Sequence, residues 1–160
     1  MAQAKTATEF LINNYAVNLI INCGAAGSLT EVFDIGDIVN ITRSLIFKDD
    51  NVQDDVCHLQ SCSPGMGGYA DGVLLTLDQP VFDRNKKNTL NIIAQLVDME
   101  GGVIARACRQ KKIPCQLIKI VSDHSVERNQ LQNNLCNVSN KLADCMVNDI
   151  TCRFGQEMIA

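Results

Sequence analysis

Residues 17–29 (VNLIINCGAAGSL) place a short aliphatic run directly before a stretch of glycine and alanine. An aliphatic run without polar alternation is typical of a strand that is buried on both faces, as strands of parallel sheets are. Small residues after such a strand let a ligand approach the backbone amides closely. Residues 24–29 are predicted to be the loop after this strand. They lack the G-x-G-x-x-G pattern, so alone they favour a tight turn from strand to loop over a ligand site.

The rest of the chain alternates between strand-like and helix-like segments. Further strands are predicted at residues 35–41, 73–77, 96–98 and 115–121. Helices are predicted at residues 2–15, 83–90, 100–111 and 126–153, and residues 48–71 are predicted to be mostly loop. Alternation of this kind predicts the α/β class, with a central and largely parallel sheet, in a single domain over residues 1–160.

Composition excludes several classes of function. The chain has 160 residues with 14 Lys and Arg against 18 Asp and Glu, so it carries no basic excess for binding nucleic acid. Aromatic residues make up 4%, which argues against a stacking surface for single strands. It has no long apolar run or secretory signal, so we expect no membrane partner and a cytoplasmic location. Its 8 cysteines form no Cys-x-x-Cys pair, so we expect reduced thiols and no metal site.

Three predicted strand ends carry polar or glycine chemistry, at residues 22–27, 98–102 and 122–124. Ligands of α/β folds bind where strands end at their carboxyl side. Asp98 and Glu100 suit the start of a helix, and equally suit carboxylates that accept the hydroxyls of a sugar. Asp123 is either a cap for the next turn or a general acid whose pKa is raised by burial.

In this order, the segments resemble the purine nucleoside phosphorylase and nucleosidase superfamily, and most closely its 5′-methylthioadenosine/S-adenosylhomocysteine nucleosidases. The resemblance is carried by residues 20–27, 35–39, 47–52, 63–65, 72–78, 97–100 and 121–123. It implies a three-layer α/β sandwich with a mixed, largely parallel sheet. Met1 falls where the family already enters the helix before its first glycine loop, so we expect the family's N-terminal strands to be missing.

The resemblance also implies roles for individual residues. Asp123 matches the acid that protonates the leaving purine at N7, and Ser122 would orient it. Glu100 matches the carboxylate that holds the ribose 2′ and 3′ hydroxyls, and Met99 would pack against the sugar. The remaining substrate-binding positions that it implies are Asp98, Gly24, Ala25, Val81 and Lys119. Neither a cofactor nor a metal is implied.

The chain departs from the family pattern at several positions. Nothing matches the acidic residue that activates water in the nucleosidases, and Ala25 stands where they usually have serine. Lys119 stands where an arginine is usual, and the two cations differ in forked hydrogen bonding. Pro80 and Val81 stand where phenylalanine and isoleucine usually line the purine pocket, so we expect weaker stacking.

Three functions therefore stay open. The first is hydrolysis of a purine nucleoside, the second is phosphorolysis, and the third is nucleoside binding without turnover. The absence of a cation from residues 18–22 favours hydrolysis, whereas residues 121–124 are slightly more similar to the phosphorylases. The family also implies a homodimer, in which residues 47–64 of one chain would complete the pocket of its neighbour.

Overall fold

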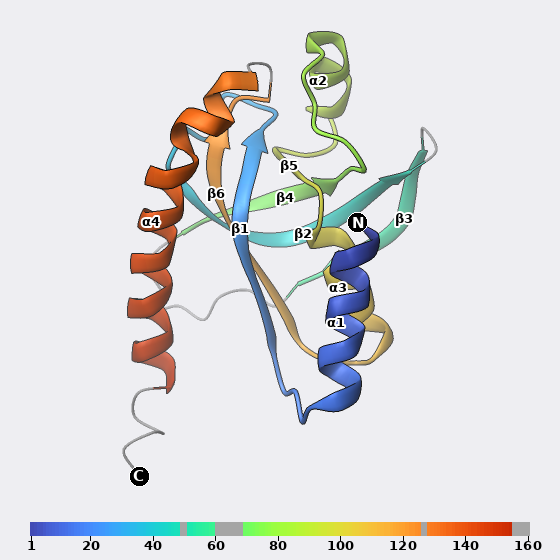
Figure 1. Ribbon diagram of the computed structural model, residues 1–160. Helices are drawn as coiled ribbons and strands as arrows, with labels where there is room; N and C mark the ends of the chain where they lie inside the picture. Colours follow the sequence, from blue (N-terminus) through green and yellow to red (C-terminus); the bar gives the residue numbers. More distant parts are fainter. Residues whose placement is uncertain (49–50, 60–68, 126–127, 155–160) are drawn as a thin grey trace.

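The computed structural model describes residues 1–48, 51–59, 69–125 and 128–154 (Figure 1). Its helices are α1 (Ala2–Asn14), α2 (Arg84–Leu90), α3 (Gly101–Gln110) and α4 (Arg128–Phe154). Its strands are β1 (Ile20–Ser28), β2 (Ile38–Lys48), β3 (Asn51–His58), β4 (Ala70–Thr76), β5 (Leu96–Asp98) and β6 (Cys115–Asp123). The predicted strands and helices are therefore all present, but β1 and β2 extend well beyond their predicted C-terminal ends at residues 22 and 41.

The strands form one sheet in the order β3-β2-β4-β5-β1-β6, and β2 also pairs with β6. Pairing is parallel for β1–β6, β2–β4 and β4–β5, and antiparallel for β1–β5, β2–β3 and β2–β6. The mixed α/β class is thus confirmed. The β2–β6 pairing closes the sheet, so it is more curved and less parallel than the flat middle layer of the expected sandwich. Closure satisfies backbone groups that an open edge would leave unpaired.

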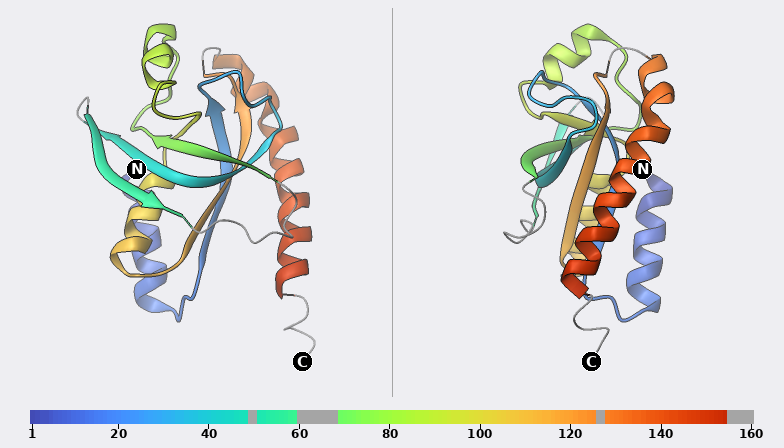
Figure 2. Two further views of the ribbon diagram at one scale, coloured as in Figure 1. Left: turned by 180° about the vertical axis from the view of Figure 1, so that it is seen from behind. Right: turned by 90° about the vertical axis from the view of Figure 1, so that its left-hand side faces the viewer.

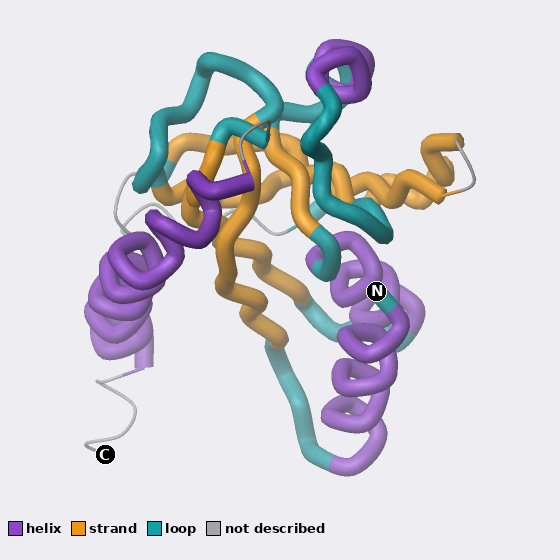
Figure 3. The backbone as a smooth tube through the Cα atoms, turned by 45° about the horizontal axis from the view of Figure 1, so that its top comes forward, coloured by secondary structure: helices purple, strands orange, loops and turns teal. Residues whose placement is uncertain are grey.

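Helices cover the sheet from two sides (Figure 2). On one side α3 packs on the strands through Ile104 and Cys108, and α1 lies against α3 (Figure 3). On the other side α4 packs Val138 and Leu142 against β6. Every residue of β6 is buried, because its side chains alternate between these two clusters. The prediction of a fully buried strand at this place is confirmed.

Two predictions were wrong. Residues 24–28, predicted as a loop, continue β1, because they pair with β6 as far as Gly27 and with β5 at Gly27 and Ser28. Residues 51–58, predicted as loop, form β3, which pairs with β2. The pairing of residues 24–28 with β5 and β6 is not visible in local sequence, because these partners lie far along the chain. The partner of β3 is the preceding strand β2, but the polar residues of the segment 51–58 gave no strand pattern.

The long helix α4 has an apolar face that is only partly buried. Val138 and Leu142 are buried, but Leu135 and Val147 are exposed, and Met146 takes a place in the core. Among the described residues, no helix combines the length and apolar character that crossing a membrane requires. Cysteines 23, 108, 115, 136 and 145 are free thiols.

Candidate active site

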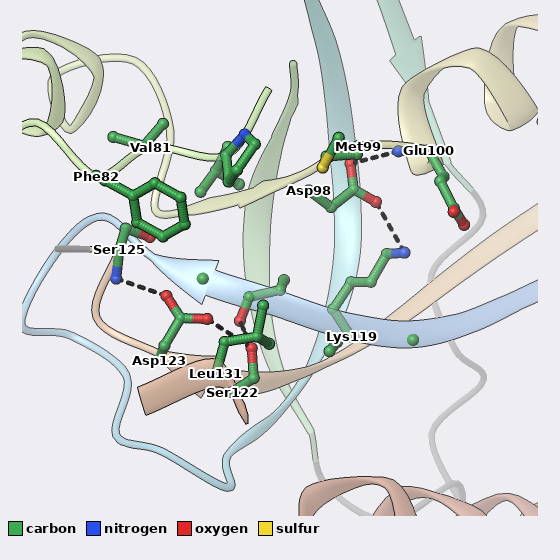
Figure 4. Close-up of a pocket in the computed structure, with 16 residues that line it drawn as sticks. Val81, Phe82, Asp98, Met99, Glu100, Lys119, Ser122, Asp123, Ser125 and Leu131 are labelled. Carbon is green, nitrogen blue, oxygen red and sulfur yellow. Dashed lines mark hydrogen bonds and ion pairs between the residues drawn. The ribbon is translucent and has the colours of Figure 1, made fainter. Parts of the chain in front are cut away.

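A cavity of about 270 Å³ lies where β1, β5 and β6 end (Figure 4). Its volume is just below the usual range of small-molecule sites, roughly 300–1,000 Å³. The cavity brings together all the site residues that the sequence predicts. These are Gly24, Ala25, Val81, Asp98, Met99, Glu100, Lys119, Ser122 and Asp123. Residues distant in sequence therefore share one wall, as the rule for strand ends predicts.

A β-bulge shapes the part of the cavity around Asp123. Ala26 is paired with Val121, but Gly27 is paired with Asp123, so Ser122 is an extra residue on β6. Bulges redirect side chains, and here two consecutive side chains both line the cavity. Ser122 Oγ donates to Asp123 Oδ2 at 2.8 Å. The backbone N–H of Ser125 donates to Asp123 Oδ1 at 2.7 Å, so each carboxyl oxygen is held by one donor.

Asp98 is the centre of a second, buried network. Its Oδ2 lies 2.8 Å from Lys119 Nζ and accepts the backbone N–H of Gly101 at 2.8 Å. Its Oδ1 accepts the hydroxyl of Thr76 at 2.6 Å. Lys119 Nζ also donates to Asn22 Oδ1 at 2.7 Å. This network ties β1, β4, β5 and β6 to the first turn of α3, and both members of the ion pair are engaged within the protein.

Met99 and Glu100 lie between β5 and α3, with Glu100 as the residue before the first helical turn. Both are exposed, Met99 to 40%. Gly101 and Gly102 follow Glu100 and, because they have no side chains, let the first turn of α3 lie close to the sheet. A Cβ on Gly101 would lie 2.7 Å from Leu74 Cδ2, and one on Gly102 would lie 2.8 Å from Ile46 Cγ1. The glycine pair therefore sets how close the start of α3, with Glu100 directly before it, lies to the sheet.

The cavity has two chemically different ends in the view of Figure 4. Met99, Glu100 and the Asp98–Lys119 pair lie at one end, and Asp123, Ser125 and Phe82 lie at the other. Of the described residues that line it, Lys119 is the only cation, and Asp98 already neutralises it. The carboxyl groups of Glu100 and Asp123 thus dominate the charge of the cavity.

Sequence reasoning missed several lining residues, namely Phe82, Val97, Ser125 and Leu131. Phe82 adjoins the predicted Val81 and supplies an aromatic ring in the wall, where we expected weak stacking. Leu131 comes from α4 and could have been found only from tertiary packing. His124 follows Asp123 directly but is not among the lining residues. Residues 49–50 and 60–64 of the predicted partner-contacting segment lie outside the described residues.

The profile of the phosphorylase superfamily matches residues 1–64 and 56–148. The chain belongs to the phosphorylase superfamily. Within it, the chain is 29% identical over an alignment of 147 residues to a 5′-methylthioadenosine/S-adenosylhomocysteine nucleosidase of Buchnera aphidicola, covering 76% of this chain and 62% of the relative. It is 28% identical to the nucleosidase of Staphylococcus carnosus, covering 75% of this chain and 63% of that protein. The chain thus spans less than two thirds of these curated relatives.

Solved structures show the same superfamily fold. The nucleosidase of Neisseria meningitidis, solved with methylthio-immucillin-A, matches with a TM-score of 0.81 at 20% identity, over 94% of this chain and 77% of that one. The nucleosidase of Helicobacter pylori, solved with butyl-thio-DADMe-immucillin-A, also matches with a TM-score of 0.81. Its identity is 18%, over 93% of this chain and 75% of that one. At such identities the likeness establishes the fold, and the chemistry must be argued from the cavity.

Proposed function

We propose that this superfamily member binds a purine nucleoside in the cavity and cleaves its N-ribosidic bond by hydrolysis. The observation that carries the proposal is the placement of Asp123 at one end of a single cavity, with Met99 and Glu100 at the other. Cleavage of this bond builds negative charge on the base and positive charge on the sugar. An acid and a sugar-binding carboxylate are the groups needed at those two ends.

In this proposal Asp123 protonates N7 of the leaving purine. Its Oδ1 is held by the N–H of Ser125, which can only donate, so the acidic proton belongs on Oδ2. The Ser122 hydroxyl, 2.8 Å from Oδ2, donates to the carboxylate that remains after the proton has passed to N7. Glu100 accepts the ribose 2′ and 3′ hydroxyls and stabilises the oxocarbenium-like state, while Met99 packs against the sugar.

Phosphorolysis is the second candidate, and the charge of the cavity disfavours it. A phosphate dianion needs cationic partners, but Lys119 is already shared between Asp98 and Asn22. The Glu100 carboxylate would also repel the anion. Water is therefore the favoured nucleophile.

The test is release of adenine from methylthioadenosine by the purified chain, with and without phosphate. Hydrolysis gives free methylthioribose in both cases, whereas phosphorolysis needs phosphate and gives a sugar phosphate. Calorimetry with methylthioadenosine tests binding separately, because a chain that binds without turnover shows heat and no adenine. A chain that shows no heat of binding and releases no adenine would refute the proposed function.

The superfamily's expected homodimer, cytoplasmic location and place in methionine salvage belong to the same proposal. Exposed apolar side chains on α1 and directly after it, namely Phe10, Leu11 and Tyr15, support an association of chains. Sedimentation of the purified chain over a concentration series measures the association, and a monomer at every concentration would contradict it.

A further inference from the structure

Ser125 carries a buried hydroxyl that the mechanism above does not use. Ser125 is only 3% exposed, and its Oγ has no hydrogen-bond partner among the described residues. Leaving a buried hydroxyl unpaired costs roughly 1–3 kcal/mol, so such groups are uncommon in folded proteins. A ligand that supplies the missing partner would explain this one, because Ser125 lines the cavity.

The hydroxyl lies beside the carboxyl group of Asp123. A Cβ built on Gly27 would collide with Ser125 Oγ and would lie 3.0 Å from Asp123 Oδ1, so both oxygens stand over the same glycine. Ser125 keeps this position through a left-handed backbone, with φ of 56°. Asp123 and Ser125 therefore present two hydrogen-bonding groups at one end of the cavity (Figure 4).

A purine carries its N7 and its 6-substituent on one edge, next to each other. The 6-substituent is a donor in adenine and an acceptor in 6-oxopurines. If Asp123 takes N7, the neighbouring hydroxyl faces the 6-substituent. A serine hydroxyl both donates and accepts, so it can pair with either kind. Ser125 Oγ has no partner among the described residues, so it is available to pair with the 6-substituent.

We propose that the Ser125 hydroxyl binds the 6-substituent of the purine, so that the cavity accepts 6-aminopurines and 6-oxopurines alike. The inference rests on the proposed function, because it requires the base to lie at Asp123. It makes that function more specific, because it names the 6-substituents that the cavity accepts and the residue that binds them.

The test is calorimetry with three free bases: adenine, hypoxanthine and unsubstituted purine. The wild-type chain should bind adenine and hypoxanthine more tightly than purine. Ser125→Ala should lower the affinity for adenine and for hypoxanthine by about 3- to 10-fold, which corresponds to the loss of one hydrogen bond. The affinity for unsubstituted purine should stay unchanged. Ser125→Gly removes the same hydroxyl and accepts positive φ freely, so agreement of the two variants excludes an effect of backbone strain.

Ser44 offers a matched control, since its hydroxyl is also buried and without a partner among the described residues, but it does not line the cavity. Ser44→Ala should leave the affinities for all three bases unchanged. Equal losses for all three bases in the Ser125 variants, or no loss, would overturn the inference while leaving the proposed function intact. A wild-type chain that binds no purine at all would overturn both.

Discussion

Lys119 Nζ lies 2.8 Å from Asp98 Oδ2, and the two side chains are only 3% and 4% exposed. The pair stands in the wall of the cavity and connects β6 with the turn that carries Met99 and Glu100. A buried ion pair of this kind contributes little compared with apolar replacements, but breaking it leaves an uncompensated charge. Its role in this fold is therefore to hold the turn in place.

We predict that Lys119→Met lowers the free energy of unfolding by about 3–5 kcal/mol, because Asp98 keeps its charge without its cation. Urea unfolding measures the change. The surface pair Lys5–Glu9, 3.7 Å apart with side chains 52% and 37% exposed, provides the control. Lys5→Met should cost no more than about 0.5 kcal/mol. Similar losses in both variants would show that the buried pair does not hold the turn.

Asp123→Asn should keep the fold and reduce adenine release by roughly 100-fold or more, since the variant cannot protonate the purine. The amide oxygen can still accept the N–H of Ser125, which preserves the local structure. Asp144→Asn, at an exposed position on α4, is the control. Near-normal release by Asp123→Asn would remove Asp123 from the role of acid.

Glu100→Gln should lower the affinity for ribosides by about 10- to 100-fold, because only a riboside presents the two hydroxyls. The affinity for free adenine should stay nearly unchanged. Calorimetry with methylthioadenosine and with adenine compares the two ligands on one variant. Glu100 also precedes the first turn of α3, where a carboxylate stabilises a helix. Equal losses for both ligands would assign it to that structural role alone.

The strand ends that form the cavity were predictable, because each combines a buried apolar run with polar or glycine residues directly after it. Asp98, Glu100 and Asp123 could be found in this way. The bulge at Ser122 and the closure of β2 on β6 could not, since both depend on pairing between distant segments. Ser125 and Phe82 were missed for a similar reason. Nothing in the local sequence distinguishes them from ordinary loop residues.

The 160-residue chain should bind methylthioadenosine but hydrolyse it far more slowly than the curated nucleosidases. Of the described residues that line the cavity, the carboxylates are Asp98, Glu100 and Asp123. Asp98 is held by Lys119, and the other two have roles at the sugar and the base, which leaves none to activate water. Adenine release beside a full-length relative checks the rate. Rapid hydrolysis by this chain would require another base, with His124, which adjoins Asp123 but does not line the cavity, as the first candidate.

Gly27→Ala and Gly24→Ala should differ sharply, although both glycines lie on β1 in the wall of the cavity. A methyl group on Gly27 would collide with Ser125 Oγ and press on Asp123 Oδ1, so it must displace the end of the cavity that is proposed to hold the base. Among the described residues, a methyl group on Gly24 would meet only Lys119 Nζ, at 3.6 Å, which is an ordinary contact. We therefore expect Gly27→Ala to weaken adenine binding by 10-fold or more, about 1.4 kcal/mol, and Gly24→Ala to change it less than 3-fold. Calorimetry with adenine measures both, and thermal unfolding shows whether either variant has lost its fold. Equal affinities of the two folded variants would place the base away from Gly27, and so away from Asp123.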